Sequence, residues 1–100
     1  MYYTYMLRCK DNSIYTGMTS DLEKRMKDHF LKSKNGAKYT KSHEAERLEA
    51  AWSTKDKSFA CKLEYYIKTL NKKQKEGLIN GQKISAYLSG KVDCRRYKRI

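Results

Sequence analysis

Five side chains are of types that can act together on a phosphate group. Tyr5 and Tyr15 stand ten residues apart, Arg25 and His29 stand four apart, and Glu64 follows later in the chain. A guanidinium carries a permanent charge and forked donors that fit a phosphate, and one carboxylate is enough to seat Mg²⁺. A histidine titrates near neutral pH, whereas a tyrosine, with a pKa near 10, needs nearby positive charge before it can act as a base. Hydrolysis of a phosphodiester is therefore the chemistry that this set would serve.

Taken one at a time, these residues have ordinary structural explanations. A tyrosine in a strand usually packs or meets an aromatic partner across the sheet. Arg25 would normally be solvated or paired with Asp21 at i−4. Gly17 alone would indicate a bend at a strand end, and Glu64 alone would be a surface charge. Only the order and spacing of the whole set favour a site.

The tyrosines and the Arg25–His29 pair depend on the elements that carry them. Residues 2–8 and 14–18 are short β-prone runs around a polar turn, which predicts an antiparallel hairpin carrying both tyrosines. The residues after it predict a helix that carries Arg25 and His29 side by side.

The start and the core face of this helix can also be predicted. Ser20 is followed three residues later by a glutamate, which is the spacing of a capping box. Leu22, Met26 and Phe30 follow at helical intervals and predict the stripe that packs on the core. Arg25 and His29 would then lie on the flank of this stripe.

Three further elements follow along the chain. Residues 47–52 fit either a third strand or a helical turn, because two alanines and a glutamate weaken a strand prediction. Ser58 opens a second helix with an apolar face, and Glu64 lies about 100° from the centre of that face. Asn71 with Gln74 has the spacing of a capping box for a third helix.

Length and charge indicate one domain and a polyanionic partner. One hundred residues can bury one modest core. We expect an α+β domain over residues 1–90 and a basic tail over residues 91–100, poorly ordered unless it docks. The 23 Lys and Arg residues against 11 Asp and Glu give a net charge of +12. Nucleic acid is the commonest partner that relieves such self-repulsion; an acidic membrane surface is the competing explanation, and a merely soluble Lys-rich protein is the ordinary one.

Cysteine usage and hydropathy indicate the compartment. Cys9, Cys61 and Cys94 have no close spacing, which argues against a disulfide framework and fits a reducing environment. These cysteines, with His29 and His43, also lack the CxxC or HxxxH spacing of a zinc site. No stretch of about 18 apolar residues is present, and the first residues lack the layout of a secretory signal. We therefore expect a cytoplasmic protein without a membrane partner.

The order of these elements and motifs resembles the GIY-YIG nucleases, whose two motifs lie on an amino-terminal hairpin. Tyr3-Thr4-Tyr5 stands in place of Gly-Ile-Tyr, and Tyr15-Thr16-Gly17 stands in place of Tyr-Ile-Gly. The resemblance runs from about residue 2 to about residue 79 and is strongest to small stand-alone members. It implies the GIY-YIG fold, a small three-stranded antiparallel sheet flanked by helices.

The resemblance also implies roles for the site residues. Arg25 matches an essential arginine on the helix after the second motif, and His29 matches a position where relatives carry His or Tyr. Glu64 matches a metal-binding glutamate, so Mg²⁺ or Mn²⁺ is the expected cofactor. We expect Tyr5 to activate water and Tyr15 to orient the phosphate or relay a proton, with His29 as the alternative base.

Several residues near this set are expected to contact nucleic acid. They are Gly17 of the second motif and the lysines of the loop after the Arg25 helix, Lys32, Lys34, Lys38 and Lys41. The resemblance favours DNA over RNA, and similar motifs occur in the bacterial excision-repair incision nuclease, which implies a role in DNA repair. One domain leaves little room for a separate specificity module, so targeting would come from DNA shape, a homodimer or a protein partner.

Three functions stay open on the sequence alone. The first is a metal-dependent endonuclease acting on DNA, selective for structure. The second is a nucleic-acid-binding module of the same fold with little or no cleavage, and the third is an interaction domain that docks on a protein. The presence of Tyr5, Tyr15, Arg25 and Glu64 together favours the first, because a binding module has no need of all four.

Overall fold

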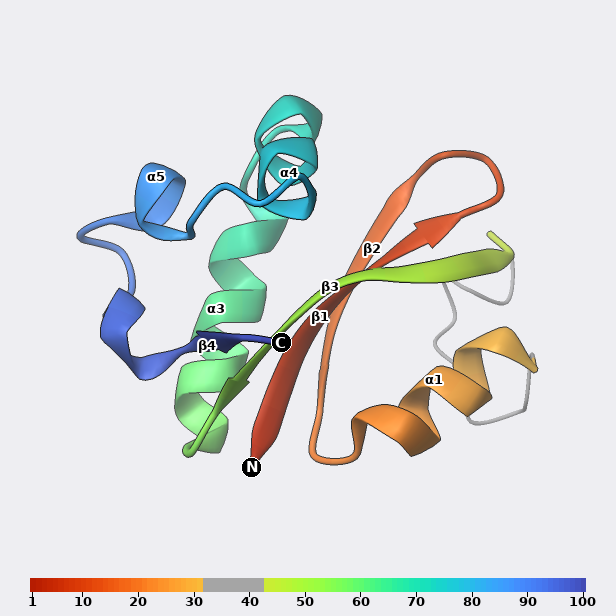
Figure 1. Cartoon of the computed structure of the whole chain (residues 1–100), viewed down its shortest axis with the longest axis horizontal. Helices are drawn as coiled ribbons and strands as arrows, with labels where there is room; N and C mark the ends of the chain where they lie inside the picture. Colours follow the sequence, from red (N-terminus) through yellow and green to blue (C-terminus); the bar gives the residue numbers. More distant parts are fainter. Residues whose placement is uncertain (32–42) are drawn as a thin grey trace.

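A four-stranded antiparallel sheet separates α1 from the remaining helices in the computed structural model, which describes residues 1–31 and 43–100 (Figure 1). In chain order the elements are β1 (Tyr2–Cys9), β2 (Ile14–Thr19), α1 (Leu22–Phe30), β3 (Ala45–Thr54), α3 (Lys57–Lys68), α4 (Lys72–Ile79), α5 (Ser85–Leu88), the 3₁₀ helix η1 (Cys94–Arg96) and β4 (Lys98–Arg99). This arrangement confirms the predicted α+β class. Within the described part of the chain, no helix combines the length and the apolarity needed to cross a bilayer.

The strands lie in the order β2-β1-β3-β4, so β1 is central and pairs on both sides. Tyr5 stands opposite Gly17 of β2 and opposite Ala51 of β3. Residues 47–52, for which a strand and a helical turn were both open, form part of β3. The hairpin prediction is thus confirmed, and the third strand is settled by its pairing with β1.

The sheet has four strands rather than the three predicted. The additional strand, β4, is two residues long and pairs with Trp52 and Ser53 at the end of β3. Two charged residues carry no alternating apolar pattern, so nothing in the sequence indicates a strand there. The pairing is imposed by tertiary contacts of the segment around it.

Alternation along the strands divides the core into two clusters, one on each face of the sheet. Met6 and Trp52 face α3 and pack with its Leu63 and Ile67. Tyr5 and its neighbours of the same parity face α1 and form the smaller cluster. The smaller cluster is the one that holds the candidate site.

The helix starts follow local capping chemistry. Asp21, and not Ser20, caps α1, since its carboxylate accepts the backbone N–H of Lys24 at 3.1 Å. Asp56 caps α3 in the same way, so this helix begins one residue before Ser58. In each case an aspartate, which is also a good cap, stands one or two residues from the serine, and its carboxylate caps the helix.

The third helix begins as predicted. The Asn71 side chain accepts the backbone N–H of Gln74 at 2.8 Å, and the Gln74 side chain accepts the backbone N–H of Asn71 at 3.1 Å. This reciprocal pair is the capping box that the spacing indicated, and it fixes the start of α4.

The core stripe of α1 differs from the predicted one at its end. Leu22 and Met26 pack on the smaller cluster as expected. Phe30, however, is 39 % exposed, whereas His29 is only 1 % exposed. Because an α-helix repeats every 3.6 residues, His29, seven residues after Leu22, lies closer to the buried face than Phe30, eight residues after it. His29 therefore lies inside the core and not on its flank.

The basic C-terminal segment is docked on the domain. Val92 is 7 % exposed and belongs to the larger core cluster. The Tyr97 hydroxyl donates to the carbonyl of Phe59 at 2.7 Å, and Arg99 Nη1 donates to the carbonyl of Leu78 at 2.7 Å. The expected disorder of this stretch was conditional on its not docking, and these contacts hold it in place.

Candidate active site

The two motif tyrosines lie on the same face of the β1–β2 hairpin. Their ring centroids are 6.2 Å apart. Gly17 stands directly opposite Tyr5, and a Cβ atom at this position would lie 2.5 Å from the Tyr5 hydroxyl and 2.9 Å from the ring of Tyr15. Glycine is therefore required here for space, so that both rings can lie across the strand.

His29 joins the two tyrosines from α1. Its Nε2 atom and the Tyr5 hydroxyl form a hydrogen bond of 2.8 Å. The imidazole centroid lies 5.6 Å from that of Tyr5 and 5.4 Å from that of Tyr15. Tyr5 is completely buried, whereas Tyr15 is partly exposed. The three rings thus form one cluster that is closed at Tyr5 and open at Tyr15.

Burial sets the charge state of the hydrogen-bonded pair. It raises the pKa of Tyr5 to about 12, although hydrogen bonding with Arg25 acts in the opposite direction. Burial also lowers the pKa of His29 to about 4, and the positive charge of Arg25 adds to this effect. At neutral pH the phenol is protonated and the imidazole is neutral, so the pair is uncharged.

Arg25 links this buried cluster to the surface. The positive charge of its guanidinium acts to lower the pKa of Tyr5 and of His29. The guanidinium lies 3.9 Å from the Asp28 carboxylate. A hollow of about 420 Å³ opens beside it, lined by residues that include Thr19, Arg25 and Asp28. Asp28 was not predicted as part of the site, although its i+3 spacing from Arg25 is visible in the sequence.

Glu64 approaches from the other side of the sheet, on α3. Its carboxylate forms an ion pair of 3.0 Å with Lys68, and its side chain is 24 % exposed, in keeping with the predicted boundary position. The negative charge of Glu64 contributes to the raised pKa of Tyr5, as the last and smallest of several causes. Glu64 therefore belongs to the same electrostatic neighbourhood, but it does not touch the three-ring cluster in any hydrogen bond of the described residues.

The donor set suits a weakly held hard cation. Within residues 1–31 and 43–100, no three His, Cys, Asp or Glu side chains gather in a way that could hold a metal ion. Glu64 thus offers a single carboxylate, which fits Mg²⁺ or Mn²⁺ because these ions keep several waters and accept substrate phosphate as a ligand. It does not fit zinc, which takes three or four protein ligands.

Four of the predicted nucleic-acid contacts lie outside the described residues. These are Lys32, Lys34, Lys38 and Lys41. For Gly17, the structure identifies a role in making room for Tyr5 and Tyr15.

Comparison with known proteins agrees with this arrangement. The model of the GIY-YIG catalytic domain matches residues 1–77. UPF0213 protein FN1575 of Fusobacterium nucleatum is 49% identical over 79 residues, which cover 79% of this chain and 77% of that protein. UPF0213 protein BH0048 of Halalkalibacterium halodurans is 43% identical over 79 residues, covering 79% and 82%.

A solved structure is similar as well. The solution NMR structure of UPF0213 protein BH0048 from Bacillus halodurans matches with a TM-score of 0.51 and 43% identity, covering 80% of this chain and 84% of that one. The family-model match over residues 1–77 spans the hairpin, the helix after it and the later helix, which together supply the candidate site. The chain therefore belongs to the family of the GIY-YIG catalytic domain, and this membership points to nuclease chemistry.

Proposed function

We propose that this protein is a metal-dependent endonuclease that hydrolyses phosphodiester bonds in DNA, with selectivity for DNA structure. The observation that carries the proposal is the convergence of Tyr5, Tyr15 and His29 around Gly17, with Arg25 between this cluster and the surface. A module that only bound nucleic acid would gain nothing from a buried tyrosine–histidine hydrogen bond. DNA is preferred to RNA, and repair substrates are preferred among DNA structures, on the strength of the family resemblance.

Arg25 is the group that would hold the scissile phosphate. It lines the hollow beside α1, and its side chain is 25 % exposed, so a phosphate oxygen can reach it. The forked donors of a guanidinium fix the orientation of a phosphate as well as its charge. Positioning and electrostatic stabilisation carry most of the catalysis of phosphoryl transfer.

The tyrosines and His29 would handle the proton of the attacking water. Tyr15 meets solvent, whereas Tyr5 is completely buried, so burial favours Tyr15 as the group that contacts the water. Tyr5 then orients His29 through its hydrogen bond. This assignment gives Tyr15 the contact with water that the sequence predicts for Tyr5.

Glu64 would hold the divalent cation. When bound, Mg²⁺ or Mn²⁺ stabilises charge on the phosphate oxygens and on the leaving oxygen. The Glu64 carboxylate must exchange Lys68 for the cation, and its partial exposure permits this exchange.

The proposal is tested by cleavage of a labelled panel of duplex, single-stranded, flap and branched DNA and structured RNA, each with Mg²⁺, Mn²⁺ or EDTA. Glu64→Gln is expected to lower metal-dependent cleavage at least about 100-fold, in the range for losing a group that supports phosphate charge. Lys68→Gln is the matched control, because it breaks the same ion pair and leaves the carboxylate in place. Retention of cleavage by Glu64→Gln would show that another group holds the cation.

The same assay separates the roles of the three rings. Tyr15→Phe is expected to lower cleavage more than Tyr5→Phe, because only Tyr15 meets solvent. If His29→Gln abolishes cleavage while both phenylalanine variants keep it, His29 is the base. If the wild type binds DNA and produces no metal-dependent product, the protein is a binding module of the same fold and these catalytic roles are wrong.

A further inference from the structure

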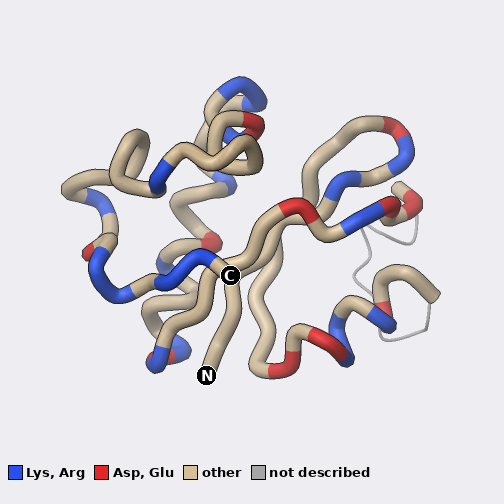
Figure 2. The backbone as a smooth tube through the Cα atoms, in the orientation of Figure 1, with Lys and Arg blue, Asp and Glu red and all other residues tan. Residues whose placement is uncertain are grey.

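A second hollow lies at the end of β3, where α3 begins and the C-terminal segment folds back. Its volume is about 370 Å³. Four cationic residues line it, Lys55, Arg95, Arg96 and Lys98, and none of the described residues that line it is acidic. Figure 2 shows these basic stretches of the chain, near the start of α3 and along the C-terminal segment.

Two of the four charges are available to a ligand. Asp93 forms ion pairs with Arg95 at 3.0 Å and with Arg96 at 3.4 Å. The side chains of Lys55 and Lys98 are exposed and have no hydrogen bond or ion pair with any described residue. Four cationic residues thus line the hollow, and the ammonium groups of two of them have no partner among the described residues.

The other walls of the hollow also suit nucleic acid. Thr54 is 3 % exposed, and its hydroxyl has no hydrogen-bond partner in the described part of the molecule. A buried hydroxyl in this state is unfavourable, and a ligand oxygen or water would relieve it. Phe59 and Tyr97 add aromatic surface, with the Arg96 guanidinium 5.4 Å from the Phe59 ring centroid. Cations combined with aromatic rings are typical of surfaces that hold single strands.

The position of this hollow relates it to the active site. Tyr3, at the start of β1, stands opposite Thr19 at the end of β2 and opposite Ser53 near the end of β3. The hollow beside Arg25 includes Thr19 and the second hollow includes Ser53, so both open at the same end of the sheet. Three strand spacings separate β2 from β4, about 14 Å. With the thickness of the sheet the path is about 20 Å, which a few nucleotides of an extended single strand can span.

We propose that the second hollow binds a phosphate of the same nucleic-acid strand that enters the active site, a few nucleotides from the scissile bond. This inference rests on the proposed function. It adds a subsite that determines how long a strand must be to contact both hollows. Lys55 and Lys98 contact the phosphate, and the aromatic walls contact the adjoining nucleotide.

The test measures binding of labelled single strands of about 4 and about 14 nucleotides by fluorescence anisotropy in EDTA, where no cleavage occurs. The variant Lys55→Gln/Lys98→Gln is compared with Lys73→Gln/Lys75→Gln, which removes the same charge from α4. The start of α4 lies at the other end of the sheet, since Lys72 donates to the carbonyl of Asn12 in the hairpin turn. We expect the hollow variant to bind the long strand about 10-fold more weakly and the short strand almost as well as wild type. Its salt slope on the long strand falls by about 0.7, the value for one lost phosphate contact to a single strand.

Several outcomes would overturn the inference. They are an equal loss in the α4 variant, an equal loss on short and long strands, or unchanged strand binding with loss of binding to anionic vesicles or polyglutamate. As a check that needs no variant, NMR titration of the wild type with the long strand should shift the amides of Thr54, Lys55 and Tyr97, and no shift there contradicts the proposal. If cleavage depends on Glu64 and the hollow variant binds like wild type, only the subsite is wrong. If the wild type neither binds nor cuts, the proposed function is wrong as well.

Discussion

Burial widens the pH range over which two residues of the candidate site stay uncharged. Tyr5 is held as a neutral phenol by burial, and His29 is held as a neutral imidazole, although each lies beside a guanidinium or another polar group. Gly17 makes this possible, because any side chain there would displace the Tyr5 ring. The site is therefore built by excluding water from one half of it while Tyr15 and Arg25 remain accessible.

A pH dependence of stability follows from His29. Its pKa is about 4 in the folded state against 6.5 in the unfolded chain. Between these values the unfolded state binds more protons, so the free energy of unfolding falls as the pH falls from 6.5 towards 4, by up to about 3 kcal/mol. We expect His29→Gln to flatten this part of the profile. Urea unfolding of both proteins at pH 7.5, 6.5, 5.5 and 4.5 measures it, and parallel profiles would show that His29 is not held neutral.

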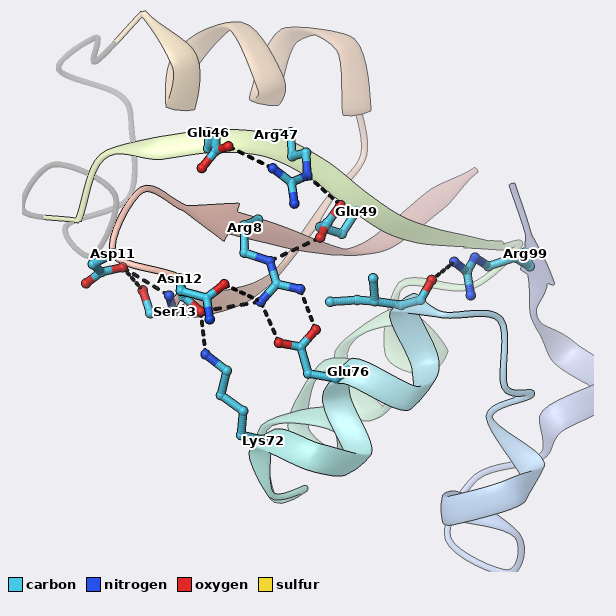
Figure 3. A network of polar contacts seen from close by, with 11 residues as sticks. Arg8, Asp11, Asn12, Ser13, Glu46, Arg47, Glu49, Lys72, Glu76 and Arg99 are labelled. Carbon is cyan, nitrogen blue, oxygen red and sulfur yellow. Dashed lines mark hydrogen bonds and ion pairs between the residues drawn. The ribbon is translucent and has the colours of Figure 1, made fainter.

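At the scale of elements, Arg8 fastens α4 to the hairpin (Figure 3). It is 6 % exposed. Its Nε donates to Glu49 of β3 at 3.0 Å, its Nη1 donates to Glu76 of α4 at 2.6 Å, and Nη1 also donates to the carbonyl of Asn12 at 3.3 Å. One guanidinium thereby joins two strands, a turn and a helix at the end of the sheet opposite the second hollow.

Removing Arg8 alone should be strongly destabilising. Arg8→Leu leaves the Glu76 carboxylate without this cation and leaves Glu49 paired with Arg47 alone, and we expect a loss of about 3 kcal/mol. Arg8→Leu/Glu76→Leu should lose less than the sum of the two single changes, because no uncompensated charge remains at Glu76. Lys10→Leu is the control, since its side chain is 62 % exposed and pairs with Glu44 at the surface; its loss should stay within about 1 kcal/mol. Denaturant midpoints of the three single variants and the double variant measure these losses. Additive losses at Arg8 and Glu76 would show that the two residues do not stabilise the protein as a pair.

These elements also show which structural features the sequence can predict. The hairpin and the Asn71–Gln74 cap depend on neighbours a few residues away, and both were predicted. The choice of Asp21 over Ser20 is a close competition between two good caps at adjacent positions. Arg8 and Glu76 are 68 residues apart in sequence, so no local pattern indicates their pairing.

At the scale of the whole molecule, the C-terminal segment closes the larger core. The Arg99 guanidinium lies 5.1 Å from the ring centroid of Trp52 and donates to the carbonyl of Leu78. Trp52 is the only tryptophan of the chain and is 4 % exposed. Its fluorescence therefore reports directly on whether this segment is docked.

Replacing Arg99 should loosen the segment. We expect Arg99→Met to lower the free energy of unfolding by about 1–2 kcal/mol, from the lost hydrogen bond and cation–π contact, and to shift Trp52 emission to longer wavelength. Lys98→Met is the neighbouring control, because the Lys98 side chain is exposed and has no hydrogen bond or ion pair with a described residue. Equal effects of the two changes on stability and emission would mean that Arg99 does not hold the segment.

The candidate site was predicted more completely than the fold around it. The motif tyrosines, Gly17 and His29 lie within the first 29 residues, and their spacing alone places them on adjoining elements. Their burial could not be predicted, because it depends on the packing of α1 against β1 and β3. The relation of Glu64 to them depends on a helix from the opposite face of the sheet. The docked C-terminal segment is charged and aperiodic, and its place is fixed only by distant partners.

The split of the site between the two faces of the sheet has a consequence for the order in which the protein forms. The β1–β2 hairpin and α1 bring Tyr5, Tyr15 and His29 together through contacts between near neighbours, which form within microseconds. Glu64 arrives only when β3 closes a long loop onto β1 and α3 packs behind it, a slower step. A chain emerging from the ribosome would thus hold its aromatic cluster before its carboxylate. The proposed capacity to bind a cation would be acquired together with the larger core, so a partly folded chain would be an inactive one.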